Sequence, residues 1–232
     1  MTNADRFIDK YKQLEEAVRF AYDLRNEDSI TSCIMNKEQF KNYREEFQYC
    51  KEVRNLLSHK KKVNNCFAVE PSDAMIEFLD SLIERIKNRP KCYQIQIKLK
   101  DVYWQPLNGK VRDTLGYMYQ KSYRCTPILN DKGVVVGIFD TDSFLSYIAV
   151  KGIDSLSEDL RFSDIYDHIC LESKKANKFI FVKSDSYADE LEERIEEVLK
   201  SGVRTELAIV TSTGSKNEKM LGIITPWEII KI

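Results

Sequence analysis

The first part of this 232-residue sequence contains no glycine. All eight glycines and four of the five prolines lie beyond residue 89, and Pro71 is the one proline before it. Glycine and proline interrupt helices, so their scarcity excludes a turn-rich sheet in this part and favours long helices. We therefore expect two domains, a helical one at residues 1–90 and a mixed helix-and-strand one at residues 91–232.

Three further absences limit the function. No apolar run approaches the roughly 20 residues that span a bilayer, and the N-terminus lacks a signal-peptide pattern, so we expect a cytoplasmic protein without membrane contact. The six cysteines form no C-x-x-C pair, which predicts neither a metal site nor a redox motif. The formal net charge of −1 predicts no overall attraction to nucleic acid.

Apolar side chains recur at helical spacing in three stretches of residues 1–90. These side chains are Phe7, Tyr11, Leu14 and Val18, then Phe40, Tyr43, Phe47, Cys50, Val53 and Leu57, then Met75, Phe78, Leu79, Leu82, Ile83 and Ile86. A short fourth helix is expected around residues 29–35, and a polar break at residues 60–65. Together these features predict an antiparallel helical bundle.

Residues 91–232 contain an internal repeat. Lys121–Leu129 aligns with Ser201–Ile209, and an amphipathic helix precedes each segment. Each segment is followed by a turn and a strand that begins Gly-Ile, at Gly137 in the first copy and at Gly222 in the second. A repeat of this length indicates two copies of one supersecondary unit that bury a shared core.

This order of elements resembles the cystathionine-β-synthase (CBS) repeat, whose motif ends in Gly-apolar-apolar-Thr/Ser-x-x-Asp. The resemblance implies an α+β fold class, with an N-terminal all-α helical bundle followed by a tandem pair of β-α-β-β-α repeats. The repeats would cover about residues 92–155 and 156–232 and form one CBS-pair, or Bateman, module.

The resemblance also implies a ligand, because CBS pairs bind AMP, ADP, ATP or S-adenosylmethionine between their repeats. The hydroxyl of the motif faces a phosphate and its acid accepts hydrogen bonds from ribose. Thr225 and Glu228 hold these positions in the second copy, whereas Asp140 and Ser143 hold them in the first. An aspartate facing a phosphate is repulsive, so we expect one competent nucleotide site, in the second copy.

Other roles stay open for these residues. Thr225 and Glu228 also have the spacing of a capping box, which starts a helix without any ligand. Arg124 and Arg204 precede the second strand of each copy and are candidates for phosphate contacts, although arginines there often pair with surface carboxylates. His168, one of two histidines, is expected at the surface.

The other histidine belongs to a second motif, in which His59 follows Arg54-Asn55 near a helix end. This motif resembles that of the HEPN (higher eukaryotes and prokaryotes nucleotide-binding) superfamily, whose active members are dimeric, metal-independent ribonucleases. The resemblance implies that Arg54 contacts the scissile phosphate, Asn55 orients it and His59 handles the 2′-hydroxyl proton.

A structural role explains the same three residues. Arg54 can pair with an acid across the bundle, Asn55 can bond a neighbouring backbone, and His59 can cap the helix C-terminus. The sequence therefore predicts a homodimeric regulatory protein whose CBS pair binds an adenine nucleotide and modulates a HEPN-like domain. A ribonuclease acting on RNA and a non-catalytic adaptor for a protein partner are the alternatives, and none of them requires a cofactor.

Overall fold

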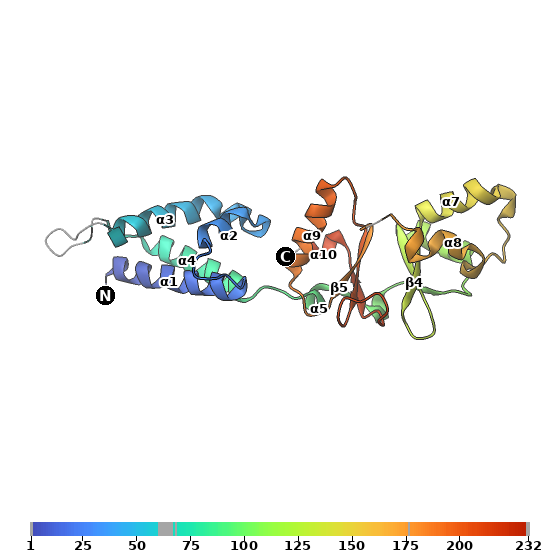
Figure 1. Ribbon diagram of the computed structural model, residues 1–232, viewed down its shortest axis with the longest axis horizontal. Helices are drawn as coiled ribbons and strands as arrows, with labels where there is room; N and C mark the ends of the chain where they lie inside the picture. The colour runs from blue at the N-terminus through green and yellow to red at the C-terminus, as the bar shows by residue number, and fades with distance from the viewer. Residues whose placement is uncertain (1, 60–66, 68, 176, 231–232) are drawn as a thin grey trace. The chain divides into compact units, whose positions relative to one another are not determined.

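The computed structural model describes residues 2–59, 67, 69–175 and 177–230, so the polar break expected at residues 60–65 lies outside the described residues. The internal contacts of the chain divide it into two compact units, Met1–Arg89 and Pro90–Ile232. The first unit is helical in its described part and the second combines helices with sheets (Figure 1). The mixed helix-and-sheet class expected from the sequence is confirmed.

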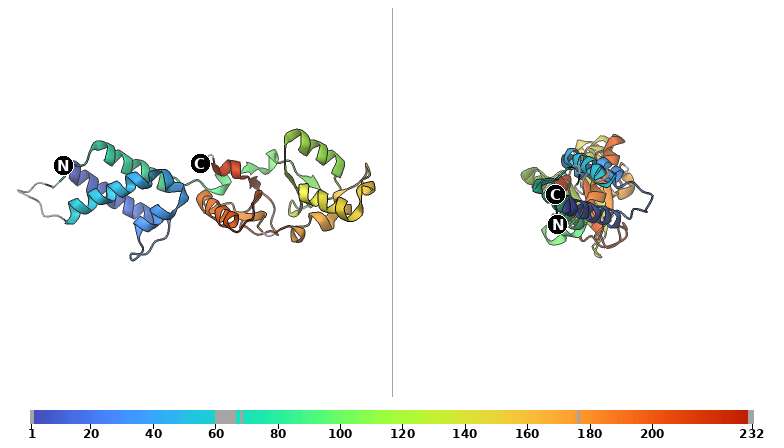
Figure 2. Two further views of the ribbon diagram at one scale, coloured as in Figure 1. Left: turned by 90° about the horizontal axis from the view of Figure 1, so that it is seen from above. Right: turned by 90° about the vertical axis from the view of Figure 1, so that its left-hand side faces the viewer.

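The first unit is built around one apolar core. Its elements are α1 (Asn3–Ala21), α2 (Ile30–Asn36), the 3₁₀ helix η1 (Glu38–Tyr43), α3 (Arg44–His59) and α4 (Asp73–Lys87). Helices α1 and α4 run side by side, with α3 against α1 (Figures 1 and 2). Side chains at the predicted helical spacing, among them Phe7, Leu14, Phe47 and Leu79, are fully buried in this core.

Side-chain caps fix where these helices begin. At the start of α1 the Thr2 hydroxyl accepts a hydrogen bond from the backbone of Asp5, and the Asp5 carboxylate accepts one from the backbone of Thr2, which is a capping box. Ser72 accepts from the backbone of Met75 and starts α4 at the position that the Pro71-Ser72-Asp73 sequence indicates. Local sequence signals therefore set these two boundaries.

The second unit contains the order strand, helix, strand, strand, helix twice. The first copy comprises β2 (Gln105–Pro106), α6 (Val111–Lys121), β3 (Cys125–Leu129), β4 (Val135–Asp140) and α7 (Thr141–Lys151). The second comprises β5 (Phe179–Lys183), α9 (Ala188–Lys200), β6 (Leu207–Thr211), β7 (Gly222–Ile224) and α10 (Pro226–Ile230). A short segment precedes the first copy, with α5 (Cys92–Ile95), β1 (Ile97–Lys98) and the 3₁₀ helix η2 (Leu99–Asp101). Between the copies lie η3 (Ile153–Ser155), η4 (Phe162–Ile165), α8 (Tyr166–Ile169) and η5 (Leu171–Ser173).

The segment that precedes each copy pairs with a strand of the other copy. The strand order is β1-β7-β6-β5 in one sheet and β2-β3-β4 in the other. Strand β1, which precedes the first copy, pairs with β7 of the second, with Lys98 opposite Gly222. The segment that precedes the second copy pairs with β4 of the first, with Cys170 opposite Gly137. The two copies are therefore interlocked.

The core of the second unit reflects this interlocking. One apolar cluster belongs to the first copy, around Ile128 and Phe139, and another to the second, around Ile180 and Val210. A third cluster draws on both copies and contains Val102, Leu129, Val135, Ile138, Leu207, Ile209 and Met220. This shared cluster makes the pair of copies one folding unit.

Candidate ligand-binding site

The second-copy motif lies where β7 ends and α10 begins. The backbone N–H of Thr225 donates to Glu228 Oε2 at 2.9 Å, and the Thr225 hydroxyl donates to the same oxygen. The Thr225 oxygen accepts in turn from the backbone of Trp227 at 3.3 Å. Thr225 and Glu228 are both half-buried, and the bond from the Thr225 backbone to the Glu228 carboxylate is the half of a capping box in which the acid accepts.

The first-copy motif forms both bonds of a capping box, and its acid and hydroxyl stand in the opposite order to those of the second copy. Asp140 caps α7 by accepting from the backbone of Ser143 at 2.9 Å, and the Ser143 hydroxyl accepts from the backbone of Asp140 at 3.4 Å. The Ser143 hydroxyl also donates to the carboxylate. The acid of the first copy, Asp140, thus precedes α7, whereas the acid of the second copy, Glu228, lies in the first turn of α10. The two departures from the family motif are therefore one coupled exchange.

Asp140 also holds two lysines. It is 1% exposed, and its carboxylate oxygens accept from Lys174 Nζ at 2.9 Å and from Lys178 Nζ at 2.8 Å. Lys174 further donates to Ser143 and to the backbone of His168, and Lys178 pairs with the Asp142 carboxylate. Asp140 is therefore a compensated charge, whereas the sequence indicates only that an aspartate at this position would repel a phosphate.

Burial and hydrogen bonding oppose each other in this cluster. Burial would raise the pKa of Asp140, but hydrogen bonds from Lys178 and Ser143 outweigh it and lower that pKa to about 2. Burial lowers the pKa of Lys174, although Asp140 opposes this effect. Burial also acts to lower the pKa of Lys178, yet its bonds to Asp140 and Asp142 raise it overall. Asp140 and Lys178 are therefore charged at neutral pH, whereas burial acts against the charge of Lys174 and Asp140 supports it.

A polar cavity of about 260 Å³ adjoins the cluster. Lys174, Lys175 and Lys178 line it together with the Asp167-His168 pair. The His168 side chain shares a hydrogen bond with Ser146 at 3.0 Å and packs edge-on against the Tyr147 ring. His168 is therefore a partly exposed residue in the wall of this cavity, where the sequence indicates a surface position.

The two candidate arginines lie at the sheet ends where the motif strands finish. Arg124 precedes β3, whose first residue pairs with Asp140, and Arg204 precedes β6, whose second residue pairs with Ile224. Both side chains are exposed. The residue that reaches the lysine cluster from this region is Glu206, at 3.6 Å from Lys178 Nζ.

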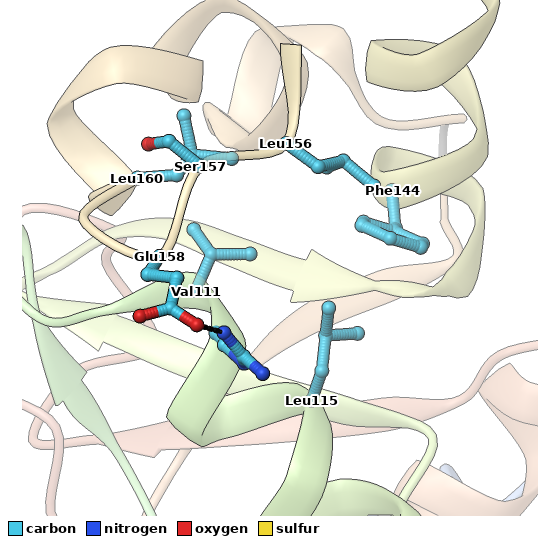
Figure 3. A pocket seen from close by; sticks show the side chains of 8 residues that line it. Val111, Leu115, Phe144, Leu156, Ser157, Glu158 and Leu160 are labelled. Atoms are coloured by element: carbon cyan, nitrogen blue, oxygen red, sulfur yellow. Dashed lines mark hydrogen bonds and ion pairs between the residues drawn. The ribbon is translucent and has the colours of Figure 1, made fainter. Parts of the chain in front are cut away.

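A second cavity, of about 220 Å³, is apolar and involves none of the residues singled out from the sequence. Leu115 of α6 and Phe144 of α7 line it together with Leu156 and Leu160 (Figure 3). An exposed ion pair between Arg112 and Glu158 lies at its edge. Its lining offers contact to apolar groups and little hydrogen bonding.

In the first unit, Arg54 reaches across to α1. Its guanidinium pairs with Glu15 at 3.3 Å and lies over the Tyr11 ring, 5.6 Å from the centroid. Asn55 is exposed, and its side-chain oxygen accepts from Arg54 at 3.5 Å. His59 is the last residue of α3, and its side chain lies outside the described part of the chain. Arg54 thus makes the cross-helix pairing that the structural explanation requires.

Two further findings concern the described residues only. No group of three or more histidine, cysteine or acidic side chains there is arranged to hold a metal ion. None of the helices found there combines the length and the apolar character needed to cross a bilayer.

Comparison with known proteins gives matches among solved structures. No protein-family model and no curated protein sequence matches the chain. The CBS-domain protein ATU1752 of Agrobacterium tumefaciens matches 61% of this chain and 96% of its own, with 17% identity and a TM-score of 0.42. CBSX2 in complex with AMP matches 61% of this chain and 93% of its own, with 13% identity and a TM-score of 0.43.

A third match carries two ligands. The CBS domain pair of MJ0100, in complex with 5′-methylthioadenosine and S-adenosyl-L-methionine, covers 62% of this chain and 94% of its own. Its identity is 14% and its TM-score 0.40. In part, therefore, the chain is similar to CBS-domain proteins.

Proposed function

We propose that the Pro90–Ile232 unit is a regulatory module that binds an adenine nucleotide or S-adenosylmethionine. The interlocked sheets are the observation that supports this proposal. Each motif lies at the end of a strand, β4 or β7, whose outer neighbour is the segment that leads into the other copy. A ligand held at either strand end would therefore contact both copies, and its binding would change their relation.

Within this proposal, Thr225 and Glu228 form the ligand site of the second copy. The capping box fixes the Glu228 carboxylate in place before any ligand binds, which lowers the entropy cost of holding ribose hydroxyls. Arg124 or Arg204, both exposed at the sheet ends, would supply the cation for a phosphate.

The test compares ligand-induced shifts in melting temperature for AMP, ADP, ATP and S-adenosylmethionine. Glu228→Gln keeps a side chain that suits the capping box but removes the charge that the ribose hydroxyls would meet. We expect this variant to lose most of the shift, and Glu27→Gln, on an exposed loop of the first unit, to retain it. Absence of a shift with all four compounds would reject the sensor function.

For the first unit we propose a non-catalytic role, in which its helices are the element that the module regulates. The pairing of Arg54 with Glu15 supports this role, because it engages the cation that a ribonuclease would aim at phosphate. The purified protein is expected to leave single-stranded RNA intact in the presence of EDTA. Cleavage that disappears in His59→Ala would establish the ribonuclease instead.

A further inference from the structure

The lysine cluster has the geometry of an anion clamp. Lys174 and Lys178 are 8% and 11% exposed, and their ammonium groups converge on the two oxygens of one carboxylate. Converging cations in a sheltered site are an arrangement that holds phosphate groups in proteins. In this protein the clamped anion is its own Asp140.

The hydrogen-bond capacity of the clamp is almost fully used in this state. An ammonium group has three protons to donate. Lys174 directs them to Asp140, Ser143 and the His168 carbonyl. Lys178 directs its own to Asp140 and Asp142, with Glu206 at 3.6 Å. Two cations face three carboxylates, so a further anion would be repelled while Asp140 is in place.

Space for a ligand lies directly beside the clamp. The polar cavity of about 260 Å³ has Lys174, Lys178 and the exposed Lys175 in its wall. Three carboxylates, those of Asp140, Asp142 and Asp167, also line it. This volume is slightly below that of typical small-molecule pockets, which span about 300–1,000 Å³. A compact phosphate-bearing ligand would fit where the ammonium groups are within reach.

The clamp also joins the two copies. Asp140 and Asp142 belong to the first copy, whereas Lys178 and Glu206 flank the first two strands of the second. Replacing Asp140 by another anion would therefore loosen a tie between the copies. Occupation of the cavity and movement of the copies would be linked.

We propose that this cavity is an anion site that the protein's own Asp140 keeps closed, and that a phosphate-bearing ligand opens it by displacing the carboxylate from the lysines. The inference rests on the proposed sensor function and adds a regulatory step at the first copy.

The test is a gain of binding. Asp140→Asn keeps the helix cap, since asparagine caps helices as well as aspartate does, but removes the competing charge. Calorimetric titration with inorganic tripolyphosphate, at matched ionic strength, should show at least about tenfold tighter binding to this variant than to the wild type. Adding Lys174→Met should abolish the gain. Unchanged binding in Asp140→Asn, or a gain that survives Lys174→Met, would overturn the proposal.

Two further variants and two further ligands serve as controls for this experiment. Asp142→Asn removes an exposed partner of Lys178 without touching a buried group, so it should fold normally and show a smaller gain. Asp159→Asn breaks a surface pair with Lys110 and should show no gain. Titration with ATP and with adenosine separates recognition of phosphate from recognition of the nucleoside. Because tripolyphosphate lacks adenine, this test can succeed even where the Thr225/Glu228 site binds no nucleotide.

Discussion

At Gly137 and Gly222, the backbone of another segment passes too close to leave room for a side chain. A Cβ atom at Gly222 would lie 2.3 Å from the Ile97 carbonyl oxygen, and one at Gly137 would lie 2.8 Å from the Ile169 carbonyl oxygen. Both distances are far below ordinary contact, and both carbonyls belong to the exchanged segments. Glycine therefore begins each repeat motif because a neighbouring chain passes directly over it.

We predict that Gly222→Ala destabilises the second unit by about 1–3 kcal/mol, because the displaced neighbour is backbone. Gly116→Ala is the matched control, since this glycine lies in α6 with no atom near its missing Cβ. The control should stabilise by about 0.5–1 kcal/mol. Urea unfolding followed by circular dichroism measures both. Equal effects of the two substitutions would contradict the steric explanation.

Asp140 gives the protein a specific sensitivity to acid. Its pKa falls from 3.8 in the unfolded chain to about 2 in the folded protein. A lowered folded-state pKa contributes stability above pH 4 that is lost as the pH falls toward 2. The contribution is about 2 kcal/mol at neutral pH.

We therefore predict that the stability advantage of the wild type over Asp140→Asn shrinks between pH 4 and pH 2. Urea unfolding of both proteins across this range isolates Asp140, because the other carboxyl groups are common to both. A difference that stays constant with pH would show that the Asp140 charge is not linked to folding.

Helices α7 and α10 each begin with a hydrogen-bonded acid and hydroxyl, in opposite sequence order. In α7 the acid is the cap and the hydroxyl follows three residues later, whereas in α10 the order is reversed. Either order joins one carboxylate to one hydroxyl. The start of the helix therefore requires one carboxylate and one hydroxyl together, and changing one of the two residues alone should destabilise the helix start.

We predict that Thr225→Asp alone destabilises the second unit by about 1 kcal/mol or more, because its carboxylate would meet that of Glu228. Adding Glu228→Ser should recover most of the loss by recreating the order found in α7. A double-mutant cycle of unfolding free energies measures this coupling. Additive effects would mean that the two positions act independently.

The sequence predicts those features of the fold that depend on residues close together in the chain. The buried faces of α1 and α4 follow from local spacing, and the repeat follows from matched Gly-Ile strands at Gly137 and Gly222. The clamp could not be predicted, because Asp140 and Lys174 meet only through the interlocked sheets. The sequence indicates that Arg54 can pair with an acid across the bundle. Glu15 is identified as that acid only by the packing of α1 against α3.

At the scale of the whole molecule, equivalent apolar side chains remain exposed on both copies. Leu145 lies five residues beyond Asp140 and is 59% exposed, and Ile230 lies five residues beyond Thr225 and is 73% exposed. Two matched apolar positions on pseudo-symmetric helices suit a two-fold partner, because one self-complementary face would cover both.

We therefore predict that the protein is a homodimer and that Leu145→Glu combined with Ile230→Glu yields the 27.2 kDa monomer. Phe20→Glu is the control, since this side chain is 92% exposed in the first unit and should leave the mass unchanged. Multi-angle light scattering gives the mass directly. A wild-type mass equal to that of one chain would refute the dimer.

The pairing of β1 with β7 also limits when the second unit can fold during synthesis. Ile97 leaves the ribosome early but finds its partner, Ile223, only after both copies have been made. Domains generally fold as units during synthesis, at roughly 5–20 residues per second. The sheet of the second copy must therefore wait, with β1 unpaired, until its last strand emerges. A ribosome that stalls within the second copy would leave a nascent chain with an open sheet edge, the kind of intermediate that chaperones protect.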